Sequence, residues 1–171
     1  ANSGIVVEIR TGDLRRYKRH GLMAGIRFQE ELEQLAFKEG GEGFQAPAQR
    51  ISDFIKGESS KTLPTSSYHP GLVNSEMHRW LPDDIGSRLK QAFTKFDTIM
   101  KGYASSEAVM VGVESRTSSP LRIPRSAETF EHIATKGLFP CGEGAGYAGG
   151  IVSSALDGAL CAEALVKSRF A

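Results

Sequence analysis

Five glycines fall within nine residues near the C-terminal end of the chain, at positions 142–150. An apolar pair, Leu138-Phe139, precedes them, and a helix-forming stretch follows from Ile151 to about Lys167. Glycine lets the backbone bend sharply and lets a ligand approach it closely. The first N–H groups of a helix have no partner inside that helix. The order of strand, glycine turn and helix therefore indicates an α/β fold with a ligand-binding turn.

The glycine turn favours some ligands over others. A triphosphate loop requires Gly-Lys-Ser/Thr at the helix start, and Gly149-Gly150-Ile151 stands there instead. The spacing Gly144-x-Gly146-x-x-Gly149 loosely matches a dinucleotide-binding turn, but the βαβ unit that should follow such a turn is absent. A helix start carries partial positive charge, so the turn suits an anionic or strongly polar ligand atom.

The rest of the chain alternates between extended and helical patterns, which predicts a mixed α+β domain of the α/β class. The clearest predicted helix begins at Pro82-Asp83-Asp84, because proline suits the first helical position and aspartates suit the first turn. The spacing of Ile85, Leu89 and Phe93 places these apolar residues on one face of the helix. The closing helix is apolar on most sides, so we expect it to pack against a sheet. The other predicted elements are a strand at 5–9, a helix at 22–39, a loop at 41–47, a short helix at 49–56, an irregular stretch at 57–74 and a strand at 108–113.

Composition excludes several classes of function. A formal net charge of +1 gives no electrostatic footprint for nucleic acid or an anionic membrane, and the basic run 15–20 is expected to be solvated surface. Two cysteines cannot form a disulfide framework, and neither a signal peptide nor an apolar span of about 18 residues is visible, which favours the cytoplasm. We predict no metal site, because the histidines lack ligand spacing. They are His20, His69, His78 and His132.

Four blocks of sequence together resemble a known family. They are Gly137–Ile151, Gln45-Ala-Pro-Ala-Gln-Arg50, Val113-Glu-Ser-Arg-Thr-Ser-Ser-Pro120 and Leu121-Arg-Ile-Pro124. The first resembles the C-terminal flavin motif of two-domain FAD flavoproteins. The set resembles the largely uncharacterised FAD-dependent dehydrogenases, sometimes labelled NAD-utilising dehydrogenases. The resemblance implies a cap or substrate-side domain at residues 1–104, and at 105–171 the C-terminal strand, glycine turn and helix of a Rossmann-like FAD-binding domain.

The same resemblance assigns roles to residues of the turn. Glu143 would accept hydrogen bonds from the flavin ribityl chain, and the backbone that follows would approach the pyrimidine edge of the ring. Arg116 and Thr117 would return to the neighbourhood of the flavin, although Arg116 could equally pair with Glu114 or a loop carbonyl. Cys141 is expected to be a small buried residue rather than a redox thiol. The cofactor-binding candidates are thus Gly142, Glu143, Gly144, Gly146, Tyr147, Gly149, Gly150, Ile151, Arg116 and Thr117; no residue stands out as catalytic.

Such flavoproteins bind the ADP half of FAD through an N-terminal βαβ unit, and this sequence contains no such unit. The chain begins at Ala1 without methionine, which is what an excised segment of a larger protein would show. We therefore expect a C-terminal fragment of an FAD-dependent oxidoreductase that is inactive alone. Its partner would be the missing N-terminal FAD-binding portion, and NAD(P)H is the candidate electron donor. Its substrate stays open. The alternative is a non-catalytic nucleotide- or anion-binding module that uses the turn as a backbone nest.

Overall fold

The computed structural model describes residues 2–170, with side chains to Ser168. These residues divide into two compact units. The first unit holds the N-terminal residues through Lys18 together with Phe28–Ser115, and the second holds Arg19–Arg27 and the residues from Arg116 onward. Mixed helix and strand, with a sheet confined to the first unit, confirm the predicted mixed α/β class.

A small mixed sheet forms the centre of the first unit. Its strands are β1 (Ala46–Arg50), β2 (Leu72–Asn74) and β3 (Val109–Val111), in the order β2-β1-β3. β1 pairs with β2 in parallel and with β3 in antiparallel orientation. The central strand is the only one of the three with three consecutive buried residues, so the packing of this unit is organised around it.

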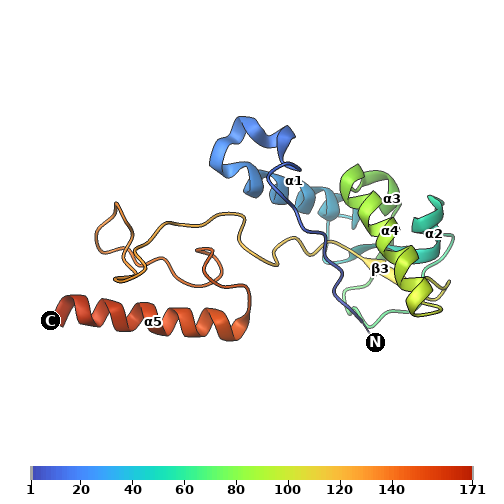
Figure 1. Ribbon diagram of the computed structural model, residues 1–171. Coiled ribbons are helices and arrows are strands. Elements are labelled where there is room, and N and C mark those ends of the chain that lie inside the picture. The colour runs from blue at the N-terminus through green and yellow to red at the C-terminus, as the bar shows by residue number, and fades with distance from the viewer. Residues whose placement is uncertain (1, 171) are drawn as a thin grey trace. The chain divides into compact units, whose positions relative to one another are not determined.

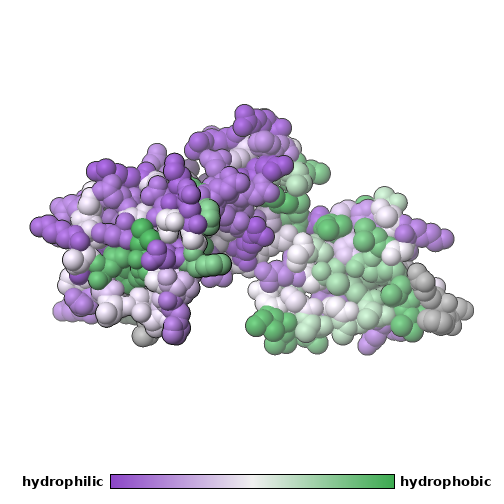
Figure 2. Space-filling view, turned by 180° about the vertical axis from the view of Figure 1, so that it is seen from behind, coloured by the Kyte–Doolittle hydropathy of each residue, from purple (hydrophilic) through white to green (hydrophobic). Residues whose placement is uncertain are grey.

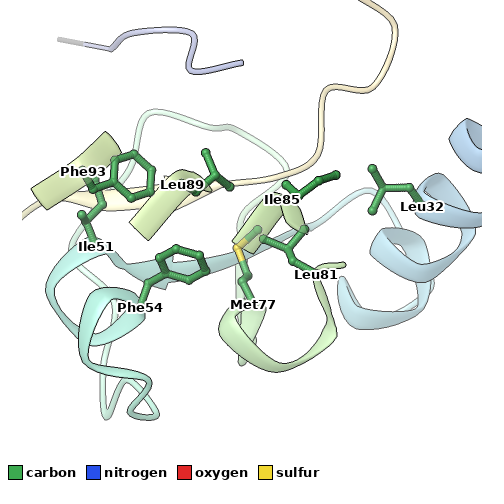
Figure 3. Close-up of a cluster of buried hydrophobic side chains, with 8 residues drawn as sticks. All are labelled: Leu32, Ile51, Phe54, Met77, Leu81, Ile85, Leu89 and Phe93. Carbon is green, nitrogen blue, oxygen red and sulfur yellow. The ribbon is translucent and has the colours of Figure 1, made fainter. Parts of the chain in front are cut away.

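Helices cover this sheet and enclose the core (Figure 1). They are α1 (Ala24–Glu39), α2 (Ile51–Lys56), α3 (Met77–Trp80) and α4 (Asp83–Ile99), and α1 is preceded by the 3-10 helix η1 (Arg15–Met23). Figure 3 shows the buried cluster that joins them, with Phe54 of α2 facing the side chains of α3 and α4. The eight members are Leu32, Ile51, Phe54, Met77, Leu81, Ile85, Leu89 and Phe93.

Both long helices of the first half confirm the sequence predictions. α4 begins at Asp83 after Pro82 and buries Ile85, Leu89 and Phe93, the predicted face. α1 ends at Glu39, and Gly41 with φ +83° follows, which is the left-handed conformation expected where glycine stops a helix. These elements depend on local periodicity and end signals, which the sequence displays directly.

Four predictions for the first unit were wrong at least in part. Residues 46–47 belong to the central strand rather than to a loop, and residues 49–50 extend that strand, so the short helix begins only at Ile51. The irregular stretch contains the edge strand β2. Residues 5–9 carry the alternating burial of a strand, with Ile5, Val7 and Ile9 against the core, but they pair with no strand among the described residues.

The second unit consists mainly of irregular chain packed along one long helix, α5 (Ile151–Phe170) (Figure 1). The helix itself was predicted, but the strand expected at Leu138-Phe139 is absent. In the described part of this unit, the extended pairing is a single bridge between Arg125 and His132. No sheet therefore lies within the described residues of this unit for α5 to pack against, and the expected sheet stays a prediction for the longer protein.

Apolar side chains of α5 are consequently exposed. Ile151 is 91% exposed, Val152 72% and Leu156 61%. Hydrophobic side chains cover much of the visible face over this helix (Figure 2). A soluble domain rarely leaves such a helix face open unless another element covers it. Even so, no helix in the described part of the chain has the length and apolar character needed to cross a membrane.

Candidate functional site

The glycine turn closes on itself through two backbone hydrogen bonds. The Tyr147 N–H donates to the Gly142 carbonyl at 3.0 Å, and the Gly146 N–H donates to the Glu143 carbonyl at 2.9 Å. Gly142 and Gly146 have φ angles of +70° and +81°, which residues with a side chain rarely adopt. A Cβ added to Gly146 would lie 2.4 Å from the Leu121 carbonyl oxygen, so this glycine is required by packing as well.

The segment 119–123 forms hydrogen bonds with the turn along one side. The Ile123 N–H donates to the Ala145 carbonyl at 3.1 Å, and the Tyr147 hydroxyl donates back to the Ile123 carbonyl at 3.0 Å. Arg122 Nε donates to the Gly146 carbonyl at 3.0 Å, and the Ser119 hydroxyl lies 3.2 Å from the Gly144 carbonyl. Two sequence blocks that seemed separate, 121–124 and the glycine turn, thus form one structural feature.

A nearly buried ion pair anchors the turn to α5. Arg125 Nη2 lies 2.6 Å from Asp157 Oδ1 and Nη1 lies 3.0 Å from Oδ2, with both side chains largely excluded from solvent. The Gly142 N–H donates to Asp157 Oδ2 at 2.8 Å. Hydrogen bonding to Arg125 holds the pKa of the Asp157 carboxyl below its usual range, and the Gly142 N–H acts in the same direction.

Arg125 also contacts both ends of the turn. Its Nη1 donates to the Pro140 carbonyl at 2.7 Å, just before the turn, and its guanidinium lies 3.6 Å from the centroid of the Tyr147 ring. The same group lies over the Phe130 ring at 4.5 Å. Stacking on the rings and bidentate hydrogen bonding to a carboxylate together fix the orientation of this guanidinium.

The outer side of the turn is open and polar. A Cβ added to Gly144 or Gly149 would meet nothing within 4 Å. Glu143 is half-buried, and its carboxylate makes no hydrogen bond or ion pair with any residue whose placement is described. The first intrahelical bond of α5 runs from the Ser154 N–H to the Gly150 carbonyl, so the preceding N–H groups have no partner within the helix.

One buried hydroxyl at this helix start is unsatisfied. Ser154 Oγ is the one buried side-chain oxygen or nitrogen without a hydrogen-bond partner within the described residues. Its Cβ would lie 3.8 Å from a Cβ placed on Gly142, so it sits beneath the turn. A carboxylate acceptor and helix N–H groups without a partner in the helix can bind both donor and acceptor groups of a polar ligand.

The structure brings most of the predicted site residues together. Residues 142–147 form the turn, and Gly149, Gly150 and Ile151 lie at the start of α5. Two predicted backbone donors are not directed to a ligand, because the Gly142 N–H binds Asp157 and the Gly146 N–H binds within the turn. Arg116 and Thr117 are exposed, and the side chain from their segment that reaches the turn is that of Ser119.

Sequence reasoning missed the ion pair that anchors the turn. Asp157 is the sole charged residue between Glu143 and Glu163, in an otherwise apolar helix start. An isolated charge in such a stretch could have indicated that Asp157 has a partner of opposite charge. Arg125 follows the 121–124 block directly, but nothing local pairs it with a residue 32 positions away.

The exposure of Cys141 differs from expectation. Cys141 is exposed rather than buried, whereas Cys161 is buried. Burial raises the pKa of the Cys161 thiol, although Arg125, whose Nη1 lies 3.1 Å from its sulfur, acts in the opposite direction. Among the described residues, no cluster of three or more histidine, cysteine, aspartate or glutamate side chains has the arrangement of a metal site.

Comparison with known proteins decides the family. The family model described as FAD-dependent protein, C-terminal domain-like, matches residues 1–117, more than half of the chain. The chain belongs to this FAD-dependent family. An uncharacterised protein of Clostridium beijerinckii is 41% identical over 169 residues, which is 98% of this chain and 31% of that protein. The chain thus spans about a third of the length of the curated relative it matches.

The family match covers the first unit and ends before the glycine turn. Within the matched region, the block 45–50 has a structural role. Arg50 donates from Nε to the Thr62 carbonyl at 2.6 Å and from Nη2 to the Thr62 hydroxyl at 2.9 Å, and its Nη1 donates to the Ser106 carbonyl. Arg50 therefore ties the central strand of this FAD-dependent C-terminal domain to its surrounding loops.

Proposed function

We propose that this chain is the C-terminal part of an FAD-dependent oxidoreductase, with the glycine turn and the start of α5 as the flavin-side wall of its cofactor site. The observation that carries the proposal is the Glu143 carboxylate, which has no partner among the described residues and belongs to a turn that leads directly into the first N–H groups of α5. The FAD-dependent family supplies the identity of the cofactor.

The chain's own groups would bind and orient the cofactor. Glu143 would accept hydrogen bonds from ribityl hydroxyls, and the first N–H groups of α5 would donate to acceptors at the ring edge. The positive end of α5 would favour negative charge there by about 0.3–2 kcal/mol. FAD itself, when bound, supplies the electron-transfer chemistry. Arg116 and Thr117 stay candidates for the same neighbourhood.

The remainder of the site would come from an N-terminal FAD-binding portion of the same protein. Two observations support that partner: α5 exposes the apolar residues Ile151, Val152 and Leu156, and the Clostridium beijerinckii relative is about three times as long as this chain. The resemblance alone supports a dehydrogenase with a nicotinamide as electron donor. We propose a cytoplasmic location on the basis of the two free cysteines.

The proposal is tested in the longer protein that carries this chain, purified and examined for the flavin absorbance near its visible maxima. We expect bound FAD, and we expect Glu143→Gln to weaken its retention by roughly tenfold because a charged acceptor is lost. Glu163→Gln, a matched change at an exposed position of α5, is the control. We expect this chain alone to bind FAD poorly.

A longer protein that never retains flavin would overturn the proposal. If it instead binds inorganic phosphate or a nucleotide tightly without flavin, the glycine turn is a backbone nest for an anion. Oxidation of NADH or NADPH by the flavin-loaded protein tests the choice of electron donor separately.

A further inference from the structure

One carboxylate connects the glycine turn to the second unit's long helix. Asp157 Oδ2 accepts both Arg125 Nη1 at 3.0 Å and the Gly142 N–H at 2.8 Å, while Oδ1 accepts Arg125 Nη2 at 2.6 Å. The side chains of Arg125 and Asp157 are only 7% and 12% exposed. Such shielding makes hydrogen bonds to charged groups directional and strong.

The pair holds the turn at both of its ends. Asp157 fixes Gly142, where the turn begins, and Arg125 fixes Pro140 just before it through a 2.7 Å hydrogen bond. Arg125 also stacks at 3.6 Å on the Tyr147 ring, where the turn closes. Glu143 lies between these fixed points without a partner of its own, so its direction is set by the backbone that the pair holds.

We propose that Arg125 and Asp157 are the positioning residues of this turn, which hold Gly142 and Tyr147 so that Glu143 and the start of α5 face the cofactor. This inference rests on the proposed flavin site. The side chains of Arg125 and Asp157 bind the inner side of the turn, so the outer side stays accessible to a ligand.

Because both residues of the pair are charged, replacing either one should change the flavin midpoint potential, which a purely structural role would not do. Arg125 and Asp157 together are neutral, so neither sign dominates beneath the turn. Asp157→Asn leaves the guanidinium without an anionic partner and should raise the flavin midpoint potential, because positive charge favours the reduced, more negative cofactor. Arg125→Gln leaves the carboxylate alone and should lower that potential.

The experiment uses the longer protein loaded with FAD. We expect Asp157→Asn and Arg125→Gln to weaken FAD binding by roughly 10- to 100-fold, because each removes a hydrogen bond to a charged group. The potentials should shift in opposite directions, and the double variant should lie near the wild type. Arg125→Lys keeps the positive charge but not the bidentate hydrogen bonds to Asp157. Its midpoint potential should therefore lie closer to that of the wild type than its FAD affinity does.

Lys136→Gln is the matched control, because it removes a positive charge at an exposed position of the second unit outside the glycine turn. We expect its FAD affinity and potential to stay close to those of the wild type. Hydrogen exchange of the Gly142 amide in the apoprotein gives a readout free of cofactor, and Asp157→Asn should speed this exchange.

The results distinguish a failure of the positioning role from a failure of the proposed flavin site. If the wild type retains no flavin, the proposed function fails. If the wild type binds flavin but both single variants bind it equally well, or their potentials shift in the same direction, the positioning role is wrong and the flavin site stands. An unchanged Gly142 exchange rate in Asp157→Asn would also overturn the role of the pair.

Discussion

The side-chain amide of Gln49 lies 2.8 Å from Nδ1 of His78, in the core of the first unit. The His78 backbone N–H donates to Gln49 Oε1 at 3.1 Å, which identifies the oxygen of this amide, and the amide nitrogen donates to the Glu58 carbonyl at 2.8 Å. The nitrogen must therefore donate to His78 Nδ1 as well, which makes Nδ1 an acceptor and the imidazole neutral. Gln49 is fully buried, so this network fixes the central strand against α3.

His78 should make the stability of the first unit depend on pH. Burial lowers the pKa of His78 below the ordinary value of about 6.5, with Arg79 and Lys90 acting in the same direction and Glu76 against them. As pH falls through about 6.5, the unfolded chain takes up a proton that the folded chain does not. The free energy of unfolding should fall until the pH reaches the folded-state pKa.

Urea unfolding between pH 8 and pH 5 measures this effect. His78→Gln should remove that part of the pH dependence, whereas His69→Gln, at an exposed position, should leave it unchanged. Identical pH profiles for the wild type and His78→Gln would contradict the neutral imidazole.

Gly146→Ala should destabilise the second unit by about 1–3 kcal/mol, because a residue with a side chain is strained in this conformation and its Cβ would lie 2.4 Å from the Leu121 carbonyl. Gly144→Ala is the matched control, since its Cβ would meet nothing within 4 Å. Urea unfolding followed through the helical signal compares the two. Equal losses from both substitutions would show that the turn does not have the described backbone.

Tyr147 should contribute through both its hydroxyl and its ring. Tyr147→Phe removes the 3.0 Å hydrogen bond to the Ile123 carbonyl and should cost about 0.5–1.5 kcal/mol of unfolding free energy. Tyr147→Leu also removes the contact with Arg125 and should cost about 0.5–2 kcal/mol more. Thermal unfolding of the three proteins should therefore give a graded series, and a Leu variant as stable as the Phe variant would exclude a contribution from ring stacking.

The two cysteines should differ in reactivity. Cys141 is exposed, while Cys161 is buried and its thiol has a raised pKa, so the reactive thiolate is both less populated and less accessible at Cys161. Brief iodoacetamide treatment at pH 8 with peptide mass spectrometry should label Cys141 at least about tenfold faster. Labelling in urea, where both thiols are free, is the control, and equal rates in the folded protein would contradict the burial of Cys161.

The elements whose signals are local could be predicted from the sequence. The apolar spacing of Ile85, Leu89 and Phe93 and the proline at position 82 predicted α4, and the end of α1 followed from its glycines. The glycine turn and the helix after it were placed correctly. Such features depend on residues a few positions apart, which the sequence displays side by side.

Contacts between residues that are distant in the sequence could not be predicted in this way. The sequence predicts a loop at 41–47, yet Pro47 lies in the central strand of the sheet, where Ala46 and Ala48 pair with β2. Residues 5–9 look like a strand but form none, because a strand requires a partner that local pattern does not supply. Arg125 and Asp157 lie 32 residues apart, and their pairing depends on the path of the intervening chain. Contact between distant residues is a property of the folded backbone, and residue type alone does not specify it.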